Sequence, residues 1–468
     1  MPRRRSDTLG GVIVAALLAL LPACATKSGQ GPEASSTSTH SPEVFSTGGR
    51  TATPAAEGDW PTYHRDAART GTVPGRPPVR GLTKAWSAAL DGAVYGQPLV
   101  VGARVLAATE NNTVYALDAG SGSVLWSRHL GSPARRAELP CGNIDPLGIT
   151  GTPVYDPTTG LVFAVAELAG GSHVLAGLDA ATGEVVVRRG LDPPKGEAVA
   201  HQQRAALTLL NGRVVVAYGG LFGDCGRYVG SVLSAPVTGA GPVRSYAVPT
   251  TREGGIWAPG GPVVDGSRLL VSVGNGEATG GTFDGSDSVL ALSEELQRTD
   301  FFAPSTWAED NAADLDLGSL SPVRVGAFVL AVGKRGTGYV LDPEHLGGIG
   351  GERSQAKLCP AYGGAAVSGS TVYLPCQDEL LEVTVTGDGT LHTGWRMPLN
   401  GSGSPVVGGG AVWVVDYGRG QLYALNPSDG RVLQQTSTGP LPHFVSPVLT
   451  GGLVLLGTMA GVTAFGTG

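Results

Sequence analysis

The strongest constraint on the fold is a hairpin that recurs along the chain from Leu82 onward. Its clearest copies are residues 114–126 (VYALDAGSGSVLW), 175–186 and 422–433. Each copy is an alternating strand, a tight turn that carries Asp or Asn with Gly, and a second strand. A further hairpin precedes such copies, for example at 98–107 and 405–414. Four strands in each unit are typical of a β-propeller blade.

The number of units predicts the number of blades. Innermost strands are expected near Pro98, Pro153, Leu207, Pro262, Pro322, Ala366, Pro405 and Pro447. These eight positions predict an all-β, eight-bladed propeller of four-stranded antiparallel blades. Seven blades is the alternative, because the third and sixth units are degenerate. The last unit ends after its third strand, so we expect the N-terminal strand at 83–90 to complete it and to remove the open sheet edge.

Composition agrees with this fold and limits the partners. Glycine makes up 74 of the 468 residues, without the three-residue period of collagen, which fits a protein with many turns. Charged residues are only 15%, and the net charge is −7 with no basic block. A mildly acidic chain of this kind argues against nucleic acid as the main partner.

The N-terminus has the features of an export signal. Arg3, Arg4 and Arg5 precede the apolar stretch 12–21, whose ten residues are too few to span a membrane. The sequence Leu-Pro-Ala-Cys at 21–24 resembles the bacterial lipoprotein signal, which implies that residues 1–23 are removed and that Cys24 is lipidated. The alternative is an ordinary secretory signal that ends near Ala23.

The segment that follows predicts a tether. Residues 24–57 are rich in Ser, Thr, Gly, Pro and Glu and contain almost no large apolar residue, so they cannot bury enough surface to fold. We expect them to hold a propeller domain, residues 58–468, away from the membrane. The expected location is the extracytoplasmic face of the cell membrane, with the lipid as anchor.

Four cysteines remain besides Cys24, an even number that suits an oxidising compartment. Three pairings are open. Cys359 and Cys376 flank a predicted strand-turn-strand unit, so a local disulfide is expected between them, which leaves Cys141 with Cys225. The alternative is four reduced, buried thiols. No Cys or His spacing suggests a zinc site.

The recurring hairpin, with Tyr-Ala-Leu-Asp and a following Gly, resembles the repeat of quinoprotein (PQQ-type) propellers. Residues 59–71 (DWPTYHRDAARTG) resemble the opening segment of that superfamily. The superfamily contains quinoprotein alcohol dehydrogenases and also non-enzymatic members, including the lipoprotein subunit that helps to assemble outer-membrane proteins. The resemblance covers residues 58–468 and therefore implies either class of function.

The resemblance implies site residues for the dehydrogenase class. Trp257 lies in the stretch that resembles the one whose tryptophan stacks on the quinone, and Asn275 in the turn that resembles the metal-binding one. Asp314 and Asp316 resemble the aspartate pair of lanthanide-type enzymes, with Asp314 as base and metal ligand and Asp316 as a further ligand. Lys334 stands where a basic residue contacts the quinone. The implied cofactor is PQQ with calcium or a lanthanide.

Other positions depart from the dehydrogenase pattern. The adjacent cysteine pair is missing, since Cys141 stands alone, and the metal-binding glutamate has no clear counterpart, although Asp224 lies in that region. A bond between Cys141 and Cys225 would cross the same funnel mouth. Each matching residue also has a structural interpretation: packing for Trp257, a left-handed turn for Asn275, and turn capping or solvated charge for the others.

These observations lead to one main hypothesis and two alternatives. The main hypothesis is a lipid-anchored propeller without catalytic activity, which acts as a binding or assembly platform for protein partners at the cell envelope. The first alternative is a PQQ- and metal-dependent dehydrogenase. The second is a funnel that binds a metal ion or a small ligand without chemistry.

Overall fold

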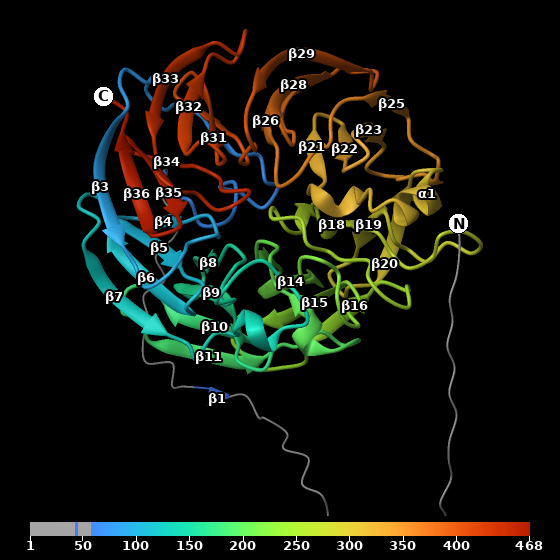
Figure 1. Cartoon of the computed structure of the whole chain (residues 1–468), viewed down its shortest axis with the longest axis horizontal. Coiled ribbons are helices and arrows are strands. Elements are labelled where there is room, and N and C mark those ends of the chain that lie inside the picture. Colours follow the sequence, from blue (N-terminus) through green and yellow to red (C-terminus); the bar gives the residue numbers. More distant parts are fainter. Residues whose placement is uncertain (1–42, 45–57) are drawn as a thin grey trace, which may run out of the picture. The chain divides into compact units, whose positions relative to one another are not determined.

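The computed structural model describes residues 43–44 and 58–468, and these form a ring of eight small antiparallel sheets (Figure 1). The protein is therefore an eight-bladed β-propeller, as the repeats predict. The predicted signal peptide, Cys24 and nearly all of the predicted tether lie outside the described residues. No helix in the described part of the chain is long and apolar enough to cross a membrane.

Each of the first four blades has four main strands, from the innermost to the outermost. They are β4 (Leu99–Val101), β5 (Arg104–Ala108), β6 (Thr113–Asp118) and β7 (Val124–His129); β8 (Val154–Asp156), β9 (Leu161–Leu168), β10 (Ser172–Asp179) and β11 (Val185–Gly190); β13 (Thr208–Leu210), β14 (Arg213–Gly220), β15 (Ser231–Pro236) and β16 (Arg244–Ala247); β17 (Val263–Asp265), β18 (Arg268–Val273), β19 (Ser288–Leu292) and β20 (Arg298–Ala303).

The other four blades repeat this order. They are β21 (Val323–Val325), β22 (Phe328–Val332), β23 (Thr337–Leu341) and β25 (Ser354–Lys357); β26 (Ala366–Ser368), β27 (Thr371–Pro375), β28 (Glu379–Val385) and β29 (Leu391–Pro398); β30 (Val406–Gly408), β31 (Ala411–Asp416), β32 (Gln421–Leu425) and β33 (Val432–Ser437); β34 (Val448–Thr450), β35 (Leu453–Thr458), β36 (Gly461–Gly466) and β3 (Thr83–Ala89). The innermost strands thus begin at the eight predicted positions or within one residue of them.

Short additional strands extend some blades. They are β1 (Glu43–Val44) on β11, β2 (Thr72–Val73) on β30, β12 (His201–Gln202) on β14 and β24 (Gly348–Ile349) on β20. Helical structure is limited to α1 (Trp307–Ala312) and the 3-10 turns η1 (Arg136–Glu138), η2 (Ala198–Ala200) and η3 (Leu317–Ser319) among the described residues.

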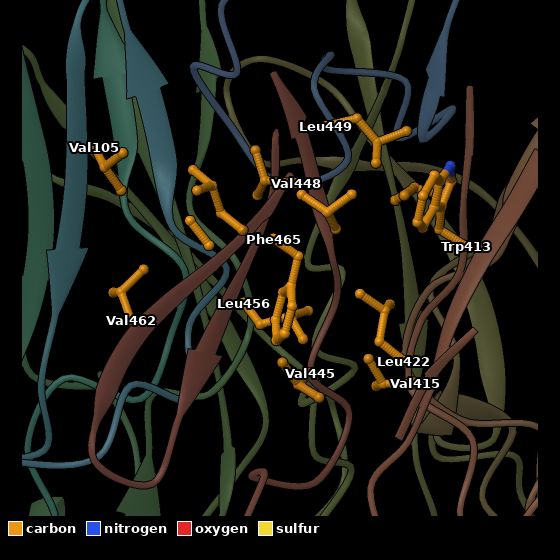
Figure 2. Close-up of a cluster of buried hydrophobic side chains, with 14 of the residues drawn as sticks. Val105, Trp413, Val415, Leu422, Val445, Val448, Leu449, Leu456, Val462 and Phe465 are labelled. Atoms are coloured by element: carbon orange, nitrogen blue, oxygen red, sulfur yellow. The ribbon is translucent and has the colours of Figure 1, made fainter. Parts of the chain in front are cut away.

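The last blade combines the two ends of the propeller. Strand β3, from the start of the domain, pairs antiparallel with β36, from its end. Figure 1 shows the two side by side at the junction of the blue and red parts of the ring. A cluster of buried side chains joins this blade to both neighbours: Phe465 and Val462 on β36 belong to the same cluster as Val105 on β5 and Trp413 on β31 (Figure 2). The predicted N-terminal closure is confirmed.

Three tryptophans form the same joint between successive blades. Trp86, Trp126 and Trp395 stand on outermost strands, and each indole N–H donates to a carbonyl oxygen in a turn of the next blade: Ala119, Ala180 and Pro427, respectively. Each ring occupies the space that a Cβ would need at a turn glycine with positive φ: Gly122, Gly183 and Gly430. The glycine in the recurring turn is therefore required both by its backbone conformation and by the neighbouring blade.

The alternation of strands sorts the loops onto two faces. In every blade the linker before the innermost strand and the turn between the second and third strands open on the same face. The turn between the first and second strands and the turn between the third and fourth strands open on the opposite face. All residues predicted for the quinone site stand in linkers or turns of the first kind, so the topology brings them to one end of the propeller axis.

Candidate functional site

A cavity of about 450 Å³ opens on this face and forms the central funnel. Its lining includes all five residues that the resemblance implies for a quinone site: Trp257, Asn275, Asp314, Asp316 and Lys334. Trp257 precedes β17, Asn275 follows β18, the two aspartates precede β21, and Lys334 follows β22. Residues that lie up to 77 positions apart in the sequence therefore share one site because neighbouring blades present equivalent loops to the axis.

Lys334 is the electrostatic centre of the site. Its ammonium group lies 2.7 Å from Asp314 Oδ1 and also forms an ion pair with Asp316. The Lys334 and Asp316 side chains are 18% and 4% exposed, whereas that of Asp314 is 64% exposed. Burial lowers the pKa of Lys334, but the attraction of Asp316 and hydrogen bonds to both carboxylates outweigh it and raise this pKa above its ordinary value. Lys334 is therefore a fixed cation at neutral pH.

Asp316 is held in place by the backbone around it. Its Oδ1 accepts a hydrogen bond from the N–H of Asn275 at 2.7 Å, which ties the Asp316 loop to the β18–β19 turn. Burial raises the pKa of Asp316, and Lys334 opposes that shift. Behind it, buried Asp287 accepts the N–H of Leu317 at 2.8 Å, and burial and the charge of Asp316 raise the pKa of Asp287 well above its ordinary value.

Asp314 projects from a loop that α1 anchors. Asp310 on this helix forms an ion pair with Arg335, the residue after Lys334. Asn311, on the same helix, accepts the N–H of Gly276 at 2.7 Å. Asp314 follows the helix with φ of +53°, a left-handed conformation that aspartate adopts more readily than most residues. The loop thus presents an exposed carboxylate to the funnel.

Trp257 lies beside both a cation and an aromatic ring. Lys334 Nζ is 6.0 Å from the centroid of the Trp257 ring, a cation–π contact, and the Phe444 ring is 6.3 Å away at a tilt of 49°. Phe444 also stacks on Tyr362, with centroids 6.0 Å apart. The tryptophan is therefore part of the wall of an aromatic funnel and not of a blade interior.

The sequence interpretation missed much of this wall, including Arg204, Tyr362 and Phe444. A positional signal links them. Tyr95, Arg204, Tyr362 and Phe444 each stand four residues before the start of an innermost strand, at β4, β13, β26 and β34. This position faces the axis in these blades. An alignment of the repeats on their innermost strands would have identified it without any family motif.

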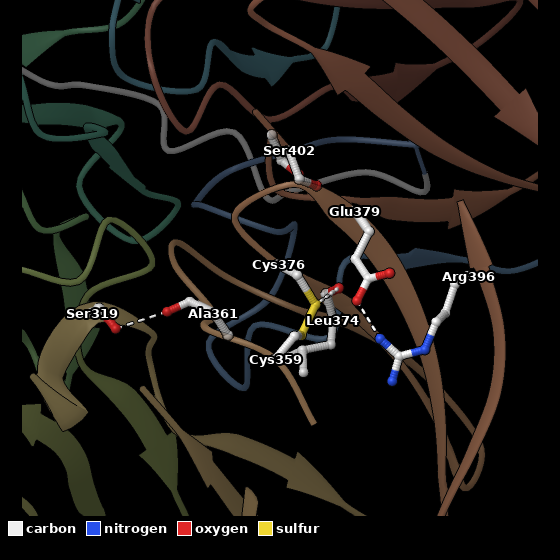
Figure 3. The surroundings of a disulfide bond; sticks show 9 residues. Ser319, Cys359, Ala361, Leu374, Cys376, Glu379, Arg396 and Ser402 are labelled. Atoms are coloured by element: carbon white, nitrogen blue, oxygen red, sulfur yellow. Dashed lines mark hydrogen bonds and ion pairs between the residues drawn. A yellow bond between two sulfur atoms is a disulfide. The ribbon is translucent and has the colours of Figure 1, made fainter. Parts of the chain in front are cut away.

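The two remaining cysteines meet at the funnel mouth. The N–H of Cys225 donates to Cys141 Sγ at 3.2 Å, and both thiols are free in the structure. Burial and the Cys225 side chain raise the pKa of Cys141 to about 11. The predicted disulfide between Cys141 and Cys225 is not formed in the structure, but the two side chains are in contact. The other pair, Cys359 and Cys376, is bonded and links the linker after β25 to the end of β27 (Figure 3).

The metal site that the resemblance implies fits these residues poorly. Asp314 and Asp316 both form ion pairs with Lys334, which offsets one of their two negative charges. Asp224 lies in the lining, where its Oδ1 accepts a hydrogen bond from the Tyr228 hydroxyl. In the part of the chain that the structure describes, the one set of three His, Cys, Asp or Glu ligands close enough for one ion contains the disulfide sulfurs of Cys359 and Cys376 with Glu379. Within the described residues, the funnel therefore offers no three such side chains close enough to one another to hold calcium or a lanthanide.

The fold and the recurring hairpin define the class: the chain is an eight-bladed β-propeller whose hairpins resemble PQQ-type repeats. Residues 83–279 match the family model described as outer membrane protein assembly factor BamB. No curated protein matches the chain in sequence.

Solved structures of two kinds share the fold. A quinohemoprotein alcohol dehydrogenase from Comamonas testosteroni superposes with a TM-score of 0.69 at 18% identity, over 88% of this chain and 81% of that one. A europium-containing methanol dehydrogenase gives 0.67 at 15% identity, over 87% and 91%. BamB from Moraxella catarrhalis gives 0.57 at 15% identity, over 82% and 97%. At these identities the likeness establishes the fold and not the activity.

Proposed function

We propose that this protein is a non-catalytic binding and assembly platform of the cell envelope, anchored by lipid on Cys24 at the extracytoplasmic face. The observation that carries the proposal is the position of Lys334, whose ammonium group pairs with both carboxylates that a catalytic cation would need. The match to a family model named for an assembly factor supports the same class of function. The funnel and its rim are the proposed binding surface.

The rim has a feature suited to a protein partner. Phe222, in the β14–β15 loop, lines the funnel and is 68% exposed, which is costly for a large aromatic side chain without a partner. Aromatic side chains at the centre of a recognition surface contribute strongly to binding. We therefore expect partners to contact this loop.

Site-specific photo-cross-linking tests the platform. A photoreactive amino acid at Phe222 should yield a defined cross-linked protein in the membrane fraction. The matched control is the same amino acid at Ser121, an exposed residue in the β6–β7 turn on the opposite face. Equal labelling from both positions, or none from Phe222, would contradict a binding surface at the funnel.

A quinone-dependent dehydrogenase is the second candidate, favoured by the gathering of all five implied residues in one cavity. Titration of the purified protein with PQQ, in the presence of calcium or a lanthanide, separates the two functions. The platform predicts no dye-linked oxidation of alcohols or sugars. The dehydrogenase predicts metal-dependent binding that Trp257→Ala removes, and activity that Asp314→Asn abolishes while the metal is retained.

A further inference from the structure

The outer edge of blade two carries a strand that comes from outside the propeller domain. β1 (Glu43–Val44) pairs antiparallel with β11 (Val185–Gly190), the outermost strand of that blade. Among the described residues, one other outermost strand, β20, is paired on that side, and its partner β24 comes from a loop of the next blade. The predicted tether is thus in contact with a defined sheet edge.

The register of this pairing matches residues of complementary kind. Glu43 lies opposite Arg188, and Val44 lies opposite Val187. Opposite charges and β-branched residues that face each other across antiparallel strands stabilise a sheet. A slip of one residue toward the start of β11 would set Glu43 against Val187 and lose both matches. The sequences of the two strands therefore favour the observed register.

The composition of the tether indicates the same segment independently. Val44 and Phe45 are the two large apolar residues between Cys24 and Gly58, and the other residues of this stretch are small, polar or charged. Valine and phenylalanine favour extended strands. The pairing with blade two therefore falls at the one place in the tether whose residues suit a strand.

The edge of blade two has reason to be covered. β11 begins with three consecutive valines, Val185 to Val187. An open edge of this composition invites pairing with another extended chain. A strand of the same chain protects it efficiently, because the short link through residues 45–57 keeps that strand at a high effective concentration.

We propose that the outer edge of blade two is a strand-addition site whose occupant is the chain's own segment 42–45. Main-chain pairing along β11 supplies the affinity, and the two cross-strand matches supply the register. This inference goes beyond the proposed function and does not depend on the lipid. With the proposed lipid on Cys24, the anchor would be joined to the side of blade two through residues 24–42, and not to the start of the propeller through all of residues 24–57.

Cleavage by chymotrypsin tests whether the segment is docked. Phe45 is the one Phe, Tyr or Trp in residues 24–57, so cleavage after it reports on this segment. A protease requires a free extended substrate, and its rate follows the population in which the pairing with β11 is open. We expect the purified full-length mature protein to be cleaved after Phe45 about tenfold more slowly than a synthetic peptide of residues 38–52.

A charge swap tests the register. Glu43→Lys should speed cleavage after Phe45 by about threefold or more, because it sets like charges opposite each other. Combining it with Arg188→Glu should restore slow cleavage. This rescue separates the pairing from the hydrogen bond that Arg188 also donates to the Leu130 carbonyl oxygen. Glu33→Lys, the same change elsewhere in the tether, is the matched control and should keep the wild-type rate.

Each cleavage rate is divided by that of the peptide with the same substitution, and circular dichroism verifies the fold. Equal cleavage of the wild type and its peptide, or an unchanged rate in Glu43→Lys, overturns the strand addition. Protection that disappears on dilution assigns the strand to a second copy and overturns the intramolecular occupant. The platform proposal fails separately, through loss of the Phe222 cross-link while Phe45 remains protected.

Discussion

At the scale of single residues, the funnel contrasts two cations. Lys334 is held by two aspartates, whereas Arg204 is held only by aromatic rings. The same cavity therefore contains a satisfied charge and an unsatisfied one. The second is the more costly to place there, because a partly buried ion loses hydration without gaining an opposite charge.

Lys334→Gln should convert the aspartate pair into a cation site. Without the ammonium group, Asp314 and Asp316 repel each other and gain from a bound metal ion. We expect terbium, measured by tryptophan-sensitised luminescence, to bind about tenfold or more tightly than to the wild type. Lys84→Gln, on the exposed surface of β3, serves as control. Identical terbium affinities in all three proteins would show that Lys334 does not block this site.

A buried histidine outside the funnel predicts a pH dependence of stability. The His173 side chain is fully buried, with Nδ1 3.3 Å from Asp192 and Nε2 3.5 Å from Glu167. Burial lowers the pKa of His173, but the hydrogen bond to Asp192 and the negative charges of Glu167 and Asp192 raise it to about 9. A raised folded-state pKa means that the stabilisation is fully present below the unfolded value of about 6.5 and is lost as the pH rises through about 9.

Urea unfolding between pH 6 and pH 10 measures this contribution. The free energy of unfolding of the wild type should fall by on the order of 3 kcal/mol across that window, relative to His173→Asn. His392→Asn, at an exposed position on β29, should follow the wild type. Parallel curves for the wild type and His173→Asn would refute the assignment.

Individual residues show which features of the site could be predicted from the sequence. Trp257, Asn275, Asp314, Asp316 and Lys334 were identified because they resemble a family pattern, and they do share one cavity. Their contacts could not be predicted: whether Lys334 binds the aspartates or leaves them free depends on loop placement by α1. Arg204 belongs to no motif, and its isolation from any carboxylate is a property of the folded funnel alone.

At the scale of secondary-structure elements, the blades resemble one another because the same type of glycine-containing turn recurs in them. Local signals, namely alternation and turn glycines, located all eight innermost strands, even in the degenerate third and sixth units. The added strands β2, β12 and β24 were not predicted, because their pairing depends on which loop passes a free edge in the finished ring. The tryptophan joints couple one repeat to the next through a turn of fixed shape.

Two turn glycines with the same φ allow the energy of one tryptophan joint to be measured. Gly183 and Gly160 both have φ of +73°, but a Cβ at Gly183 would lie 2.6 Å from Trp126, while at Gly160 it would meet nothing within 4 Å. Gly160→Ala should cost about 1 kcal/mol through its backbone alone. Gly183→Ala should cost about 1–3 kcal/mol more, measured by chemical unfolding. Equal losses would mean that the joint adjusts freely.

The linkers at the funnel mouth lead to a prediction about Cys141 and Cys225. We propose that an oxidising compartment would join them as a disulfide, since they are already in contact and connect a loop of blade two with a loop of blade three. Mass spectrometry after alkylation of the unfolded, unreduced protein should find neither thiol free. Cys225→Ser should leave Cys141 as a single alkylated thiol. Alkylation of both cysteines in the wild type would contradict the bond.

At the scale of the whole molecule, the propeller explains how one chain combines likeness to enzymes with likeness to an assembly factor. A closed ring of blades supports its loops without depending on their chemistry, so the same scaffold carries unrelated sites. The class of fold could be predicted from the sequence because each repeat independently indicates the same four-stranded unit. The activity did not, since it depends on a few loop residues that the repeats leave free.

The proposed lipid anchor belongs to this scale as well, because it would determine where in the cell the propeller acts. Cys24→Ser should release the protein from the membrane fraction into the soluble fraction or the medium, measured by fractionation and immunoblotting. The matched control is Cys225→Ser, which removes a cysteine from the propeller and should leave the distribution unchanged. A membrane-bound Cys24→Ser protein would exclude lipid on this residue as the anchor.

The pairing of β3 with β36 also has a consequence for how the protein is made. A ribosome delivers the chain from its N-terminus, so β3 emerges before the main strands of the other blades and β36 after all of them. Until then the first strand has no sheet of its own, and the partial ring is open on both sides. Closure of the ring therefore waits until β36 has been made, and we expect a product truncated before β36 to keep an open sheet edge.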